Sequence, residues 1–137
     1  MPIRLNGSAL KAANNIIIWY LLLLIAYQAH LFEEIVGDFA AISVLGSVTN
    51  FLIVNLLIFC IFVFTLYHLI AQKRWAYKLA IFLAIGMTLN GIGHNVAYWF
   101  NISPFGGPLA GEYSGLALII IGPILAVYLK RGLGNFR

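Results

Sequence analysis

Four long apolar runs dominate this chain of 137 residues, and only short connections separate them. Each run has about the 20 residues that a helix needs to cross the hydrocarbon core of a bilayer. A segment in lipid must satisfy its backbone hydrogen bonds internally, which favours helices. The sequence therefore predicts an all-α protein with four transmembrane helices, at roughly residues 14–32, 50–71, 76–100 and 113–129.

The shortage of charged residues supports the same interpretation. Only 9% of the residues are charged, whereas an average soluble domain has about 25%. That deficit is too large for a surface that faces water, so we expect lipid to cover most of the exterior. The four spans leave no stretch for a second soluble domain, and residues 1–137 are expected to form a single integral membrane domain.

The charged residues sort onto two sides of the membrane when four spans are drawn. All eight basic residues then fall on one side, namely Arg4, Lys11, Lys73, Arg74, Lys78, Lys130, Arg131 and Arg137. All four acidic residues fall on the other side, namely Glu33, Glu34, Asp38 and Glu112. Basic residues near the ends of spans mark the cytoplasmic face. We therefore expect a multi-pass protein of the cell membrane, an antiparallel bundle with both termini in the cytoplasm. This topology accounts for the net charge of +4, so no nucleic-acid partner is expected.

The stretch HLFEE places a histidine and two glutamates at the outer end of the first span. Positions three and four apart share a helix face, so His30 stands beside both Glu33 and Glu34. The two glutamates point about 100° apart, and at most one of them aims where His30 aims. The third span carries Asn90 and His94, which are also four residues apart and near its outer end. In an antiparallel bundle both histidines then lie at one depth.

Two histidines and nearby carboxylates on facing helices make a candidate metal site. Imidazole together with carboxylate suits zinc, iron or manganese, and we favour zinc or iron. The expected ligands are His30, Glu33, Glu34 and His94, at a site that faces the extracytoplasmic side. Glu33, Glu34 and Asn90 are the candidate catalytic residues, because the carboxylate that is not a ligand would act as a base. The same groups could also perform acid–base chemistry without a metal.

Each of these residues also has a simpler interpretation. The two glutamates can be the polar end of the first span, reaching toward the headgroups. Asn90 can bridge two helices through a hydrogen bond. Glu112 is expected to be a solvated acid in the last loop, and His68, near the inner end of the second span, is assigned no role. The matching depth of the two histidines favours the site, because ionisable groups inside membranes are usually functional.

Two glycines precede the histidine of the third span. Gly91 and Gly93 lie three residues and one residue before His94. They remove side-chain bulk at this depth. We expect them either to let another helix approach closely or to leave room for a ligand.

The stretch HLFEE resembles the signature of the HXXEE-motif family of small bacterial membrane proteins, with His30, Glu33 and Glu34 at the motif positions. That family has a second histidine in a later span, and His94 in NGIGHNV is similar to it. Its third motif, Y-x-P-G before the last span, is matched in part by YSG at 113–115, where the proline is missing, or by SPFG at 103–106, where the tyrosine is missing. The resemblance implies the same span arrangement and the same histidines, but the family has no assigned function.

The combined pattern favours a small membrane enzyme, a metal-dependent hydrolase or isomerase acting on a lipid-soluble small molecule near the outer leaflet. One alternative is a non-catalytic accessory or assembly subunit of a larger membrane complex, in which the HLFEE layer is a structural hydrogen-bond network. Another is a haem protein with His30 and His94 as axial ligands. A proton-coupled transporter of amphipathic cations ranks lower, because its acids should lie near the midplane. The sequence leaves a homo-oligomer open, since lipid-facing and partner-facing surfaces are both apolar.

Overall fold

Helices account for most of the chain that the structure describes. The computed structural model describes residues 7–103 and 108–136, and in these ranges it contains five α-helices and no strand. Four of them are long and apolar enough to cross a membrane: α1 (Gly7–Val36), α3 (Val48–Ile70), α4 (Arg74–Trp99) and α5 (Glu112–Leu133). The short helix α2 (Ala40–Val44) joins α1 to α3, and a 3-10 turn (Gly134–Phe136) follows α5. The prediction of an all-α protein with four transmembrane helices is confirmed.

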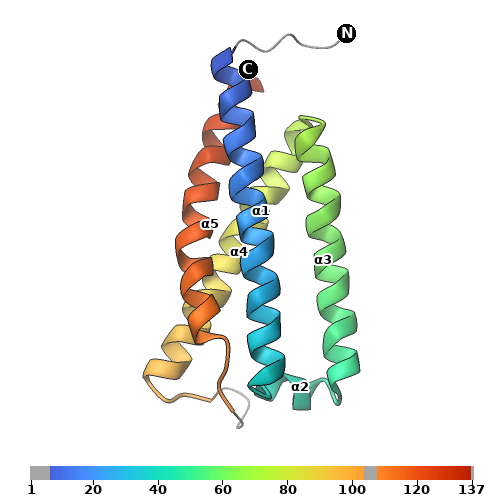
Figure 1. Cartoon of the computed structure of the whole chain (residues 1–137), viewed down its shortest axis with the longest axis vertical. Coiled ribbons are helices and arrows are strands. Elements are labelled where there is room, and N and C mark those ends of the chain that lie inside the picture. The colour runs from blue at the N-terminus through green and yellow to red at the C-terminus, as the bar shows by residue number, and fades with distance from the viewer. Residues whose placement is uncertain (1–6, 104–107, 137) are drawn as a thin grey trace.

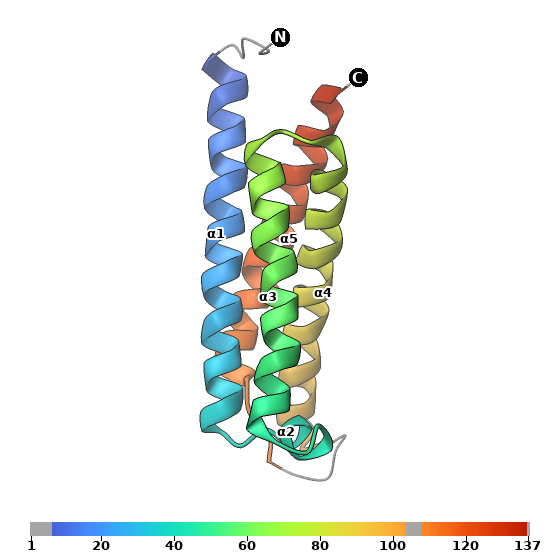
Figure 2. The same cartoon turned by 90° about the vertical axis from the view of Figure 1, so that its right-hand side faces the viewer.

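The four long helices alternate in direction, as Figures 1 and 2 show. The start of α1, the end of α5 and the α3–α4 connection therefore lie at one end of the bundle. This end carries the basic residues Lys73, Arg74, Lys130 and Arg131. The opposite end carries α2 and the acidic residues Glu33, Glu34, Asp38 and Glu112. The expected separation of charge is thus present in the bundle, and the cytoplasmic location of the basic end stays a prediction.

Helices α1, α3 and α4 all end in the same way. The residue two positions beyond each helix takes a left-handed backbone conformation, with φ of 50° at Asp38, 52° at Gln72 and 51° at Asn101. The next N–H then bonds to a carbonyl five residues back, as from Phe39 to Glu34 at 2.9 Å. This Schellman closure satisfies carbonyl groups that a helix end leaves free. At the end of α1 it also turns the chain back across the bundle.

Helix α4 has its most extensive contact with α5, and the two backbones approach each other closely at glycines. A Cβ atom on Gly91 would overlap the carbonyl oxygen of Gly115, and one on Gly122 would lie 2.8 Å from the carbonyl oxygen of Ala84. Small residues at such positions let helices in membranes approach closely. For the two glycines before the third-span histidine, the expectation of close helix contact is confirmed, and room for a ligand stays a prediction. Gly91 allows helix contact, whereas the Cβ position of Gly93 has open space around it.

Helix α1 is the most buried of the four long helices and α3 is the least. In the most apolar 18-residue window of each helix, 39% of the α1 window is buried inside the protein, compared with 17% of the α3 window. The centre of the bundle is filled by large side chains from three helices, including Tyr20, Leu23, Phe62, Leu118 and Leu125. Most of α3 therefore faces outward, where its exposed apolar side chains are suited to lipid.

Candidate metal centre

Two histidines and one glutamate meet at the end of the bundle opposite the α3–α4 connection. One ligand atom from each of His30, Glu34 and His94 lies within 4.8 Å of the other two. Glu34 Oε1 is 3.2 Å from His94 Nε2 and 3.6 Å from His30 Nε2. The two imidazole rings meet edge to face, with centroids 4.6 Å apart. Helix α1 supplies His30 and Glu34 one turn apart, and α4 supplies His94 at the same depth.

These three side chains are nearly closed off from their surroundings. His30 is 1% exposed and Glu34 is 7% exposed. Burying an ionisable group is costly unless it is paired or coordinates a metal. A glutamate that reached toward headgroups would be far more exposed, so the simpler interpretation of Glu34 as the polar end of a span does not fit.

Each ring nitrogen of His30 has its own partner. Asn90 Nδ2 lies 3.0 Å from Nε2, and Ser114 Oγ lies 3.0 Å from Nδ1. An amide N–H only donates, so these partners assign the proton to Nδ1 and the lone pair to Nε2. Nε2 lies on the side of Glu34 and carries the lone pair. A metal ion bound to this lone pair would replace the hydrogen bond from Asn90.

His94 is oriented in the same sense. Its Nδ1 lies 2.5 Å from the carbonyl oxygen of Ala110, which can only accept a hydrogen bond. The proton is thereby placed on Nδ1, and Nε2 faces Glu34. Histidines that bind metals usually donate their other ring N–H to an acceptor of this kind, which fixes the tautomer and the ring. Both imidazoles of the group have this arrangement.

The neighbouring glutamate has a different task. Glu33 turns to the start of α5, where its carboxylate accepts hydrogen bonds from the backbone N–H of Tyr113 at 3.1 Å and of Ser114 at 2.8 Å. The hydroxyl of Ser114 also donates to it at 2.5 Å. The residue before α5 is Gly111, which has no side chain to cap the helix. A residue of α1 thus provides the cap that N-terminal N–H groups require.

Gly111 is the point where α5 meets both imidazoles. Its φ of 93° lies in the left-handed region, which favours glycine. A Cβ atom here would lie 2.6 Å from His30 Cε1 and 2.8 Å from His94 Nδ1. No larger residue fits without moving one of the rings, so this glycine permits the compact site.

A cavity of about 230 Å³ adjoins the group on the side of α4. His94 and Asn90 are the polar side chains that line it, and the other lining residues are Phe39, Leu89, Gly93, Ala97, Leu109 and Ala110. The Phe39 ring, brought back by the Schellman closure of α1, lies 4.7 Å from the His94 ring between centroids. Leu89 is 62% exposed at the rim, so the cavity meets the lipid-facing surface of α4.

The predicted site residues thus divide into three positions. His30, Glu34 and His94 form the group, Asn90 hydrogen-bonds to it, and Glu33 caps α5. The roles of these residues in metal binding and catalysis stay predictions.

The expectation for Glu112 is wrong. It is the first residue of α5, not a loop residue, and one of its carboxylate oxygens is buried. The helix starts this early because Gly111 provides the turn and accepts the N–H of Gly115 at 2.9 Å. Tyr113 has a side chain that is 74% exposed and contacts the site through its backbone.

Three site residues, Ala110, Gly111 and Ser114, are not predicted from the sequence. All three lie within two residues of Glu112, and Ser114 lies in the segment that resembles the third family motif. Their nearness in sequence to Glu112 is therefore a signal that they lie at the depth of the site. Serine and glycine are too common in loops and at helix starts for the residue type to add to that signal.

The alternative of a haem protein, with His30 and His94 as axial ligands, does not fit this geometry. A haem would need the His30 and His94 rings to face each other across a flat slot, whereas these rings touch edge to face at 89°. Glu34 also occupies the space near both Nε2 atoms.

Comparisons with known proteins leave the site to be interpreted from its own geometry. No family model, curated protein or solved structure matches this chain.

Proposed function

We propose that this protein is an integral membrane metalloenzyme whose centre consists of His30, Glu34 and His94. One observation carries the proposal: both Nδ1 atoms are engaged by hydrogen bonds, and both Nε2 atoms face the same oxygen of Glu34. Two histidines and a glutamate are the protein ligands of several catalytic zinc sites, which keep a further position for water or substrate. Zinc is therefore the preferred ion, and iron is the alternative with similar ligand preferences.

The reaction that these groups support best is hydrolysis, with isomerisation as the second choice. A bound divalent ion would polarise a carbonyl group or a water molecule. Asn90 is placed to orient the substrate, because its carboxamide lies beside His30 and lines the cavity. Both oxygens of Glu33 are engaged by α5, so we assign Glu33 to positioning and not to the role of the base.

The substrate that suits the cavity is an uncharged, lipid-soluble molecule. Apart from Asn90 and His94, the described residues that line the cavity offer it no polar side chain. The described lysines and arginines lie at the other end of the bundle. They are therefore too far from the cavity to pair with a charged headgroup bound there. Exposed Leu89 and Gly93 at the rim support access from the bilayer.

The location of the site follows from charge. We place the basic end in the cytoplasm and the metal centre on the extracytoplasmic side, because positive residues flank spans on the cytoplasmic side. Membership of the HXXEE-motif family is part of the same proposal. It is supported by His30, Glu33, Glu34 and His94 at the corresponding positions.

Metal analysis of the purified full chain tests the proposal. We expect wild type to retain about one zinc or iron per chain and His94→Ala to lose it, since three ligands become two. His68→Ala is the matched control, because His68 lies on α3 among aromatic rings, outside the group. An ion-free wild type that also fails to bind added zinc or iron would sink the proposal. The enzymatic part is tested by hydrolysis of a long-chain nitrophenyl ester in nanodiscs, which His94→Ala should abolish.

A structural role is the second candidate, and one observation favours it. Three of the four ring nitrogens of the two histidines have hydrogen-bond partners within the protein, and a proton on His94 Nε2 would pair the fourth with Glu34. Such a layer can stabilise a bundle without any ion, as an accessory subunit would require. This candidate predicts equal metal content in wild type and His94→Ala, together with co-purification of a fixed set of larger membrane subunits.

A further inference from the structure

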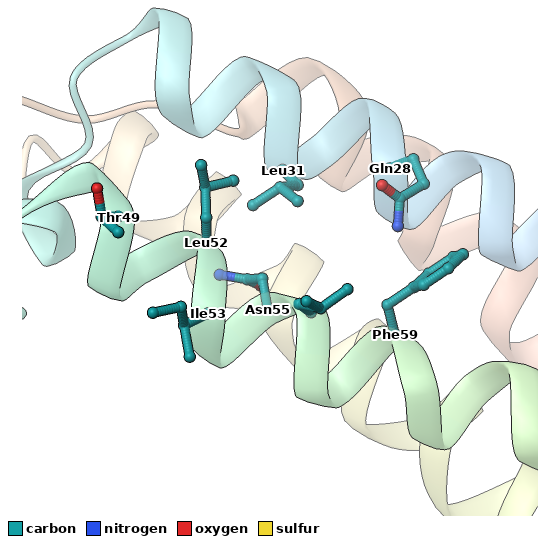
Figure 3. Close-up of a pocket in the computed structure, with 8 residues that line it drawn as sticks. Gln28, Leu31, Thr49, Leu52, Ile53, Asn55 and Phe59 are labelled. Carbon is teal, nitrogen blue, oxygen red and sulfur yellow. The ribbon is translucent and has the colours of Figure 1, made fainter.

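A groove between α1 and α3 lies outside the metal centre, on the surface that faces the bilayer. Its volume is about 450 Å³, within the range of small-molecule pockets, which is about 300–1,000 Å³. Its apolar lining consists of Leu31 on α1 and of Leu52, Ile53, Leu56 and Phe59 on α3. Figure 3 shows these side chains along the two facing helices. The remaining question is what fills it.

Two tyrosines explain why the groove exists. The hydroxyl of Tyr27 donates to Asn55, with its oxygen 2.8 Å from Oδ1, and the hydroxyl of Tyr20 donates to the carbonyl of Phe62 at 3.0 Å. Both links run from α1 to α3 through a full aromatic side chain. The Tyr27 ring also stacks on Phe62, with centroids 5.4 Å apart. These long side chains hold the helices together while keeping their backbones apart, so the outer side of the interface is left open.

The side chain of Gln28 indicates what kind of molecule occupies the groove. It lies in the membrane-spanning part of α1, and its exposed carboxamide turns toward α3 across the groove (Figure 3). The described part of the chain gives this carboxamide no hydrogen-bond partner. An amide without a partner in hydrocarbon is costly, and polar side chains in membrane spans normally face a partner or a cavity. A molecule in the groove that carries a polar group would supply the missing hydrogen bond.

The groove's chemistry narrows the occupant to a neutral molecule. Its other polar side chains are the hydroxyl of Thr49 and the amide of Asn55, and none of the described lining residues is charged. The Asn55 amide is already engaged by Tyr27 and by the carbonyl of Phe51. An anionic headgroup would have no counter-charge here. A carbonyl or hydroxyl group on an apolar chain would meet Gln28 and the leucines together.

The groove's length argues against a helix of another protein. On α3 it runs from Thr49 to Phe59, which is about 16 Å at 1.5 Å per residue. A transmembrane helix needs about 30 Å of contact surface to pack along its length. The groove therefore covers about half of a span.

We propose that this groove binds a neutral lipid-soluble molecule whose carbonyl or hydroxyl group hydrogen-bonds to Gln28. The site is separate from the metal centre and does not depend on the proposed reaction. Gln28 fixes the depth of the polar group, and the leucines and Phe59 contact the apolar chain.

The test uses two photoactivatable probes and the full chain in nanodiscs of ether-linked phosphatidylcholine, which has no ester carbonyl groups. One probe is a diazirine-bearing monoacylglycerol, and the other is a diazirine-bearing alkane of the same length. We expect the acylglycerol to label 28–31 and 52–59 preferentially, and the alkane to label all lipid-facing surfaces evenly. Even labelling by both probes would overturn the proposal without any mutation.

Variants sharpen the test. Gln28→Leu should reduce acylglycerol labelling of the groove about threefold to tenfold, the effect of one lost hydrogen bond in a membrane. Leu56→Trp should block the groove, whereas the matched control Leu57→Trp should not, because Leu57 does not line it. Leu56 and Leu57 are 59% and 63% exposed, so both should tolerate tryptophan. Unchanged labelling in Gln28→Leu and Leu56→Trp would contradict the proposal. A dimer that Leu56→Trp dissociates would also contradict it, since a second copy would then be the occupant.

Discussion

The carboxylate of Glu33 on α1 accepts the backbone N–H of Ser114 on α5 at 2.8 Å, and thereby caps a helix that has no cap of its own. The same Ser114 hydroxyl lies 3.0 Å from His30 Nδ1. One contact therefore fixes the start of α5 and the orientation of an imidazole. The predictions below follow from this coupling and from the close packing around it.

Replacing Glu33 should lower stability more than its partial exposure suggests. In Glu33→Ala the N–H groups of Tyr113 and Ser114 lose their acceptor, and loss of a helix cap costs about 1–2 kcal/mol. Chemical unfolding in detergent, followed by circular dichroism, measures this. Asp38→Asn is the control, because asparagine also tolerates the left-handed conformation at this exposed position. A stability loss in Glu33→Ala no greater than in Asp38→Asn would show that the cap contributes nothing.

Removing the Ser114 hydroxyl should weaken metal binding without unfolding the bundle. In Ser114→Ala the Nδ1 proton of His30 loses its hydroxyl acceptor, and the preference for the tautomer that exposes Nε2 is weakened. Loss of such a supporting contact typically costs about 10–100-fold in metal affinity. Competition with a chromophoric zinc chelator measures the affinity, and nitrogen NMR of the imidazoles reports the tautomer.

Two further variants separate this effect from a general loss of structure. Ser114→Thr should restore both readouts, since it returns the hydroxyl. Ser43→Ala on α2, an exposed position away from the group, should match wild type. An unchanged His30 tautomer in Ser114→Ala would show that the Ser114 hydroxyl does not orient this imidazole.

Gly111→Ala should disrupt the centre and the start of α5 together. The added Cβ would lie 2.6 Å from His30 Cε1, and the residue would keep a φ of 93° that alanine disfavours. We expect a loss of about 2–3 kcal/mol from strain and overpacking, and loss of the metal. Gly86→Ala is the matched control. It has no atoms near its Cβ position, and alanine in a helix should be neutral or stabilising by up to about 1 kcal/mol. Equal stabilities for the two variants would contradict this account.

Gly91 and Gly93, only two residues apart, should respond oppositely to alanine. At Gly91 the Cβ would overlap the backbone of α5 at Gly115, so Gly91→Ala should force the helices apart at a cost of about 1–3 kcal/mol. At Gly93 there is open space, and alanine should leave the fold intact. Thermal unfolding in one detergent compares the two. A more severe effect at Gly93 than at Gly91 would mean that α4 packs against α5 through a different face.

Most of the fold could be predicted from the sequence, because lipid imposes a strict requirement on it. The apolar runs must be helices and must have about the length of the bilayer core. The short connections then require antiparallel neighbours. The spacing of His30 and Glu34 places them on one face of α1, and the sorting of charge places His94 at the same depth. These inferences need only helix geometry and the count of spans.

The tertiary structure decided which glutamate joins the histidines and what the other one does. Glu33 and Glu34 differ by a rotation of about 100° about the helix axis, and the sequence does not say which direction faces α4 and which faces α5. Packing settles this, because the large side chains that α1 buries fix its rotation, which turns Glu34 toward His94 and Glu33 toward the start of α5. Ser114 and Gly111 reach the site only through the docking of α5 on α1. The sequence by itself thus determined the helices and the depth of each ionisable group, whereas the rotation of each helix, and with it the partners of every site residue, depended on contacts between distant segments.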